Sequence, residues 1–177
     1  AVHESCRVRG HPAQAAAVSA AARVPRNHTL TVRGARIAWR EWGAAHESPV
    51  LALHGWLDNA ASFDVLAPLL TGCRVIAPDL PGHGLSDHRG PEGSYNIWDD
   101  LPDLVAFTAE LGLSRYRLLG HSRGAAIATL LAAIEGDGVS TLVMLDGLAA
   151  PPADPAGTVD QLRAFAHDYG RRDPREA

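Results

Sequence analysis

From about residue 29 onward, short apolar runs alternate with longer segments whose apolar residues recur at helical spacing. Short apolar runs bounded by turn residues predict strands, here residues 30–32, 37–42, 49–53, 74–77, 115–119 and 141–145. Single helices between consecutive strands imply a parallel sheet with right-handed crossovers. The first two runs are separated only by residues 33–36, and this spacing predicts an antiparallel hairpin.

Three segments have the features of helices. Ser62 is expected to cap the first, in which Phe63, Leu66, Leu69 and Leu70 form one apolar stripe. Asp99 or Asp100 begins the second, which tolerates Pro102 in its first turn and ends at Gly112. The third covers residues 123–135 and is rich in alanine.

A polar loop follows each of three predicted strands. The loops are residues 54–58, residues 78–86 and the Gly-His-Ser-Arg-Gly segment at 120–124. Because the carboxyl ends of parallel strands meet at one edge of a sheet, we expect these three loops to lie together. The same edge is where open α/β sheets place their ligand sites.

Ser122 is the first candidate for chemistry. It lies in a Gly-x-Ser-x-Gly segment that joins a predicted strand directly to a predicted helix. A serine at such a turn has a strained backbone and an exposed hydroxyl, and the flanking glycines permit close passage of strand and helix. The alternative interpretation is a loop serine that only caps the helix. The strand-turn-helix context favours the nucleophile.

Taken together and in this order, the HGW, DLPGHGLS and GHSRG segments resemble the α/β-hydrolase family. The longer stretches HGWLDNAASFDVLAPLL and VIAPDLPGHGLSDH are most similar to its serine-hydrolase-like branch. The resemblance covers about residues 29–150. It implies an α/β fold with a mostly parallel sheet and helices on both faces, truncated after the sixth strand.

The resemblance also implies the remaining site residues. The backbone N–H groups of Arg123 and Trp56 would form the oxyanion hole, and Gly55 would allow the tight turn that aims the Trp56 amide inward. The Trp56 indole would either line the acyl pocket or pack in the core. His54 and His121 are expected to orient turns rather than to transfer protons. The turn beside the oxyanion hole is assigned to the scaffold, and its residues are Asp79, Gly82, His83 and Gly84.

The sequence offers one candidate for the acid of a catalytic triad and no good candidate for its base. Asp146 ends the strand expected beside that of the nucleophile, and it is a candidate acid; otherwise it is a turn residue or lines the pocket. His167 is the only histidine after Ser122, and it falls in a predicted lid helix rather than after a strand. We therefore expect the catalytic histidine to lie outside this chain, which would be the N-terminal part of a longer protein.

The expected function is a serine hydrolase acting on a small-molecule carboxylic ester or a related acyl or C–C bond. A perhydrolase is a close alternative, and a non-catalytic truncated or pseudo-hydrolase chain is the competing class. Serine at the elbow argues against the dehalogenase and epoxide-hydrolase branches, which by resemblance use aspartate there. No organic cofactor is expected. His83, Asp87 and His88 could suggest a metal site, but two residues in a mobile loop rarely make one without a third ligand fixed elsewhere, so no metal is expected either.

The expected organisation is an N-terminal extension at 1–28, a core at 29–150 and the start of a lid at 151–177. The chain has 177 residues, a net charge of −4 and no apolar stretch near the ~20 residues of a membrane span. This charge gives no basic field for nucleic acid. Cys6 and Cys73 are the only cysteines, so we expect a buried free Cys73 and a cytoplasmic location. The arginine-rich, acid-poor first 28 residues leave an organellar presequence as an alternative. The oligomeric state stays open.

Overall fold

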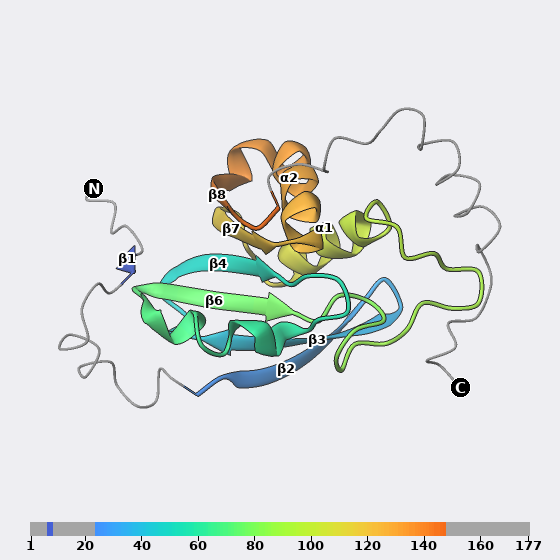
Figure 1. Cartoon of the computed structure of the whole chain (residues 1–177), viewed down its shortest axis with the longest axis horizontal. Helices are drawn as coiled ribbons and strands as arrows, with labels where there is room; N and C mark the ends of the chain where they lie inside the picture. Colours follow the sequence, from blue (N-terminus) through green and yellow to red (C-terminus); the bar gives the residue numbers. More distant parts are fainter. Residues whose placement is uncertain (1–6, 9–23, 148–177) are drawn as a thin grey trace.

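The computed structural model describes residues 7–8 and 24–147 of the chain (Figure 1). Its main feature is a six-stranded sheet with the order β2-β3-β6-β4-β7-β8. The strands are β2 Arg26–Val32, β3 Ala35–Trp42, β4 Ser48–Leu53, β6 Cys73–Pro78, β7 Tyr116–His121 and β8 Val139–Leu145. The helices are α1 Asp100–Glu110 and α2 Arg123–Glu135. Short elements complete the description: β1 Arg7–Val8, β5 Leu70–Thr71, and the 3-10 helices η3 Ala60–Phe63, η4 Ala67–Leu69 and η5 Gly136–Gly138.

The pairing directions agree with the sequence pattern. β2 and β3 form the expected antiparallel hairpin, and β3 pairs antiparallel with β6. β6, β4, β7 and β8 pair in parallel with one another. The prediction of a mostly parallel sheet is confirmed. The carboxyl ends of these four strands, and the loops that follow them, therefore share one edge of the sheet.

The centre of the sheet is buried on both faces. Leu51 and Leu53 of β4 point into a core shared with α1 and α2, which pack together on one side (Figure 1). Val50 and Ala52 alternate with them and point to the opposite face, where Phe63 of η3 also packs. Residues of β4 are thus apolar at every position from 50 to 53, as expected for a strand covered on both sides.

The segment 62–70 does not form the expected helix. It forms η3 and η4 instead, and the cap is Asn59, whose side chain accepts a hydrogen bond from Ala61 N–H at 2.9 Å. The Ser62 hydroxyl donates to the Asn59 carbonyl at 2.8 Å rather than capping a helix. Pro68 explains the interruption, because proline lacks an N–H and its ring clashes with the carbonyl four residues earlier.

The amino-terminal region differs in two further respects. β2 begins at Arg26, so residues 26–28 belong to the sheet, and Arg7–Val8 pairs with Leu70–Thr71. Cys73 is disulfide-bonded, with its partner outside the described residues, which corrects the expectation of a free thiol. The disulfide removes the argument for a reducing compartment.

Within the described residues, no helix is both long and apolar enough to cross a membrane. The predicted lid at 151–177 and His167 lie outside the described residues.

Candidate active site

Ser122 occupies the sharp junction between β7 and α2. Its backbone has φ 50° and ψ −118°, a strained combination for a residue with a side chain, which costs about 1–3 kcal/mol. Its N–H donates to the Leu145 carbonyl at 2.9 Å, and its own carbonyl accepts from Ala125 N–H at 2.9 Å. The Ser122 side chain does not cap α2, so the helix-capping alternative has no support. The predicted strained turn is present.

The two glycines of the motif are required by close packing. A Cβ on Gly120 would lie 2.5 Å from the Ala125 Cα, inside the turn that begins α2. A Cβ on Gly124 would overlap the Leu53 carbonyl oxygen at the end of β4. Such distances are far below any real contact, so only glycine allows the elbow to sit against β4.

The His54-Gly55-Trp56 loop lies directly beside the elbow. A Cβ on Gly55 would lie 3.1 Å from His121 Nδ1 and 3.4 Å from Ser122 Cβ. Trp56 is 54% exposed, so its side chain does not pack in the core. Its ring lies edge-on to His83, with centroids 5.9 Å apart, and under the Arg123 guanidinium, 5.3 Å from the ring centroid. The two segments expected to supply the oxyanion donors are therefore adjacent.

His54 joins this loop to the turn after β6. The ring is fully buried; its Nε2 accepts from Leu80 N–H at 3.0 Å, and Nδ1 lies 2.8 Å from the Gly55 carbonyl. The bond from Leu80 makes Nε2 the acceptor, so Nδ1 carries the proton and donates to Gly55. Burial is the main cause that lowers the pKa of His54 to about 4, and the imidazole is neutral at pH 7. Both ring nitrogens are occupied, which fits the expected orienting role.

The neutral state of His54 makes stability depend on pH. Above about pH 6.5 both folded and unfolded states hold a neutral ring. Between pH 6.5 and 4 only the unfolded state gains the proton, so the free energy of unfolding should fall by up to about 3 kcal/mol. Urea unfolding of the full-length protein at pH 7 and pH 4.5 measures this loss. His54→Gln should remove most of it, and His46→Gln, at an exposed position, should not. Equal pH dependence in the wild type and in His54→Gln would contradict the prediction.

Asp79 organises the turn after β6. Its Oδ1 accepts from Ala60 N–H at 2.7 Å and its Oδ2 from Leu85 N–H at 2.8 Å. A Cβ on Gly84, whose φ is 52°, would strike this carboxylate. Ser86 Oγ donates to the Asp79 carbonyl at 2.6 Å. These contacts support the scaffold role that we assigned to Asp79 and Gly84.

The Arg123 side chain forms a buried ion-pair network that sequence reasoning missed. Arg123 Nη2 donates to Asp100 Oδ2 at 2.7 Å and to the Tyr95 carbonyl at 3.1 Å. Asp100 Oδ1 accepts from Arg89 at 3.1 Å, and Arg89 also pairs with Asp103 at 2.7 Å. Burial opposes the charge of Arg89, but its bonds to the two carboxylates raise its pKa. These partners are far apart in sequence, and their residue types carry no local signal that would pair them.

Asp146 follows β8 next to the elbow. β8 pairs in parallel with β7, with Leu145 opposite His121, as the assignment of Asp146 as acid requires. A Cβ on Gly147 would lie 2.9 Å from the Ser122 carbonyl oxygen, so the chain passes directly against Ser122 at this point. Asp146 itself is exposed and has φ 51°. The backbone thus brings Asp146 to the neighbourhood of the nucleophile.

The other polar groups of this edge have different partners. Asp87 binds Arg36 through its carboxylate at 3.0 Å, and His83 Nδ1 lies 3.1 Å from the Pro81 carbonyl. The part of the chain that the structure describes contains no group of three ligands able to hold a metal ion.

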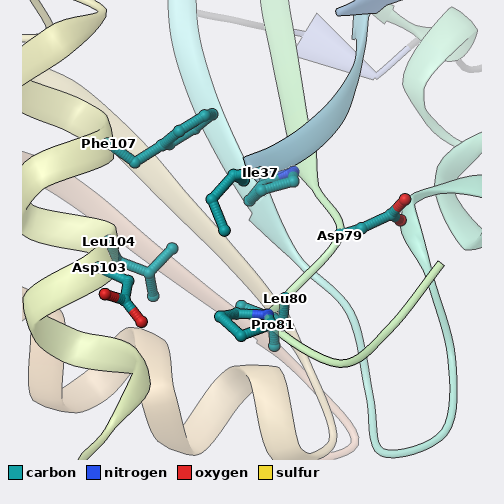
Figure 2. Close-up of a pocket in the computed structure, with 8 residues that line it drawn as sticks. Ile37, Asp79, Leu80, Pro81, Asp103, Leu104 and Phe107 are labelled. Atoms are coloured by element: carbon teal, nitrogen blue, oxygen red, sulfur yellow. The ribbon is translucent and has the colours of Figure 1, made fainter. Parts of the chain in front are cut away.

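Two cavities lie away from Ser122. One of about 10 Å³ lies between α1 and the Leu80–Pro81 turn, with Leu104 and Phe107 on its helix side (Figure 2). It has room for about one water molecule. The other, of about 160 Å³, is lined by residues of β2 and β3 and by Asp79 and Leu85. Neither is lined by the nucleophile candidate.

Comparisons with known proteins agree with this geometry. The family model of the alpha/beta hydrolase fold matches residues 48–177. A serine hydrolase-like protein of Danio rerio is 36% identical over 129 residues, which are 72% of this chain and 39% of that protein. The chain thus spans well under two thirds of the length of this relative.

Solved structures give the same result. A hypothetical protein from Pseudomonas aeruginosa PAO1 has a TM-score of 0.73 and 36% identity, covering 84% of this chain and 54% of that one. A thioesterase domain from the curacin biosynthetic pathway has a TM-score of 0.72 and 30% identity, covering 85% of this chain and 56% of the other. The chain therefore belongs to the α/β-hydrolase fold family, in its serine-hydrolase-like branch.

Proposed function

We propose that this chain carries the nucleophile and oxyanion hole of a serine hydrolase acting on carboxylic esters or related acyl substrates. The backbone of Ser122 is the observation that carries the proposal. A serine held at φ 50° between a strand and a helix costs stability, and such strain persists mainly where function requires it. The thioesterase domain among the similar structures also acts on an acyl group, which supports this substrate class.

The chemistry follows from the positions of the groups. Ser122 Oγ attacks the acyl carbon, its proton passes to a histidine base, and the carbonyl π electrons move onto oxygen. The N–H groups of Trp56 and Arg123 donate to that oxyanion. When the tetrahedral intermediate collapses, the alcohol leaves with the proton from the histidine, and water then hydrolyses the acyl-serine by the same steps. No metal or organic cofactor takes part in this sequence.

The base cannot be His54, because both of its ring nitrogens are hydrogen-bonded and burial lowers its pKa to about 4, which makes the ring a weak proton acceptor. We assign the base to a histidine outside the described residues, and the acid to Asp146. Serine at the elbow disfavours epoxide or dehalogenase chemistry, which by family resemblance begins at an aspartate.

A fluorophosphonate probe tests the assignment of the nucleophile directly. The full-length protein should be labelled at Ser122, as located by mass spectrometry of the modified peptide. The Ser122→Ala variant should not be labelled. Equal labelling of both would exclude Ser122 as the nucleophile.

The 177-residue chain expressed alone should self-associate and should show no Ser122-dependent turnover of a p-nitrophenyl ester. In the described residues β8 has only β7 as a neighbour, and Val143 and Leu145 are 44% and 38% exposed. Exposed apolar edge strands pair with other chains. Size-exclusion chromatography should show oligomers that Val143→Lys reduces and Val65→Lys, at an 80% exposed position away from the edge, does not. A monomer with Ser122-dependent turnover would contradict both parts.

A further inference from the structure

Asp100 is an almost completely buried carboxylate at the first residue of α1, with a side chain only 1% exposed. Each oxygen binds a different arginine, Oδ1 at 3.1 Å from Arg89 and Oδ2 at 2.7 Å from Arg123. Its place in the first turn of a helix adds the favourable field of the helix N-terminus. Isolated buried charges are costly, so a carboxylate in this position is tolerated only with such partners.

The Arg123 side chain connects this carboxylate to the oxyanion loop. It is 10% exposed, and its Nη2 is held by both Asp100 and the Tyr95 carbonyl. The guanidinium lies over the Trp56 ring, 5.3 Å from its centroid, and such cation–π contacts are worth about 0.5–2 kcal/mol. One side chain therefore joins the residue that carries one oxyanion donor to the ring of the residue that carries the other.

Trp56 depends on such a contact for its position. Trp56 is 54% exposed, so core packing does not fix its ring, and Leu57 follows it with φ 55°. An oxyanion hole is effective only when its donors stay within hydrogen-bond distance of the developing charge, and small displacements lose rate. A weakly packed loop needs a fixed partner to meet that requirement.

We propose that Asp100 is a positioning residue for the oxyanion hole: it holds the Arg123 guanidinium against the Trp56 ring and so fixes the two backbone donors relative to Ser122. This role rests on the proposed function. The alternative is an ion pair that only ties α1 to α2. The two differ in what they affect, because a purely structural pair changes stability and leaves the rate of each folded molecule unchanged.

The test uses the full-length protein and the variants Asp100→Asn, Arg123→Met and the double variant. Arg123→Met keeps the backbone N–H and removes only the guanidinium. Each variant is measured for kcat and KM on a p-nitrophenyl ester, per active site titrated with a fluorophosphonate. The Ki of an alkyl trifluoromethyl ketone, which forms an oxyanion in the hole, is measured on the same preparations.

Asp100→Asn and Arg123→Met should each lower kcat and weaken the ketone by about 10- to 50-fold, less than the 10²–10³ lost with a whole donor. KM should change by less than about threefold, because ground-state binding does not use the oxyanion. The double variant should be within about twofold of either single variant, since both substitutions break one chain of contacts. Asp103→Asn is the matched control: it lies one turn later on α1 and binds Arg89 but not Arg123, and it should change kcat less than about twofold.

Equal losses in Asp100→Asn and Asp103→Asn, or additive losses in the double variant, would overturn the positioning role. If Asp100→Asn does not fold, Arg123→Met decides alone, and an unchanged Ki for the ketone would overturn it. Ser122→Ala in the same panel separates the two proposals. Turnover retained in Ser122→Ala would overturn the serine-hydrolase function and the role of Asp100 with it. Loss of turnover there leaves the other variants to judge Asp100.

Discussion

Replacing Ser122 with alanine in the full-length protein should lower ester turnover by about 10⁴-fold or more. The substitution removes only the hydroxyl, which is the group that we propose forms the covalent acyl intermediate. Members of a catalytic triad act as a unit, so the rest of the site recovers little of the loss. Alanine also keeps the Cβ at φ 50°, so the strained turn is retained. Steady-state kinetics with a p-nitrophenyl ester measures the effect.

Ser62→Ala is the matched control for this experiment. Ser62 is exposed on η3, and its hydroxyl donates to the Asn59 carbonyl at 2.8 Å, away from the elbow. Its loss should change turnover by less than about twofold. A Ser122→Ala protein that folds and keeps more than about a hundredth of wild-type turnover would show that the nucleophile is another residue.

Asp146→Asn should lower turnover by about 10³- to 10⁴-fold while the fold stays intact. The asparagine side chain has nearly the same shape, but it carries no charge and no longer holds the histidine in the productive tautomer. Asparagine also tolerates the left-handed conformation that Asp146 adopts at φ 51°, so backbone strain does not confuse the result. The measurement is kcat of the full-length protein, with thermal unfolding to check the fold.

Asp137→Asn provides the control at the other end of α2. Asp137 lies in η5, where its backbone carbonyl accepts a hydrogen bond from Arg115 at 3.3 Å. Turnover should be unchanged. A loss below about tenfold in Asp146→Asn would move the acid to another part of the protein.

The elbow could be predicted because its determinants are local. The apolar run of β7, the glycines on either side of Ser122 and the alanine-rich segment that follows are contiguous, and α2 spans the predicted residues 123–135. Gly120 and Gly124 also indicate tertiary contacts in the sequence, because each lies so close to a backbone atom of the folded chain that only glycine fits. The parallel pairing of the strands could also be predicted from the sequence, because strands joined by single crossover helices can pair in few ways.

The helix expected over residues 62–70 was wrong because the apolar stripe that predicted it is interrupted by Pro68. Phe63 is buried and Leu66 and Leu70 pack partly against the same core, but Leu69 is exposed, since proline prevents a continuous helix and the chain forms two short 3-10 turns. The cap moved accordingly from Ser62 to Asn59. The error in the cap reflects local competition between the side-chain hydrogen bonds of Asn59 and Ser62, which composition alone does not rank.

The sequence by itself determined the family, the positions of the core strands along the chain and the residue that we assign as nucleophile, because these depend on contiguous motifs and on the period of apolar positions. Only the tertiary structure decided how the polar side chains pair. Arg123 meets Asp100 across 23 positions, and Arg89 meets the same carboxylate from a different loop. The exposure of the Trp56 ring and the disulfide at Cys73 were decided in the same way. Such contacts depend on where elements pack in three dimensions, and a charged residue in a sequence does not indicate which opposite charge it will reach.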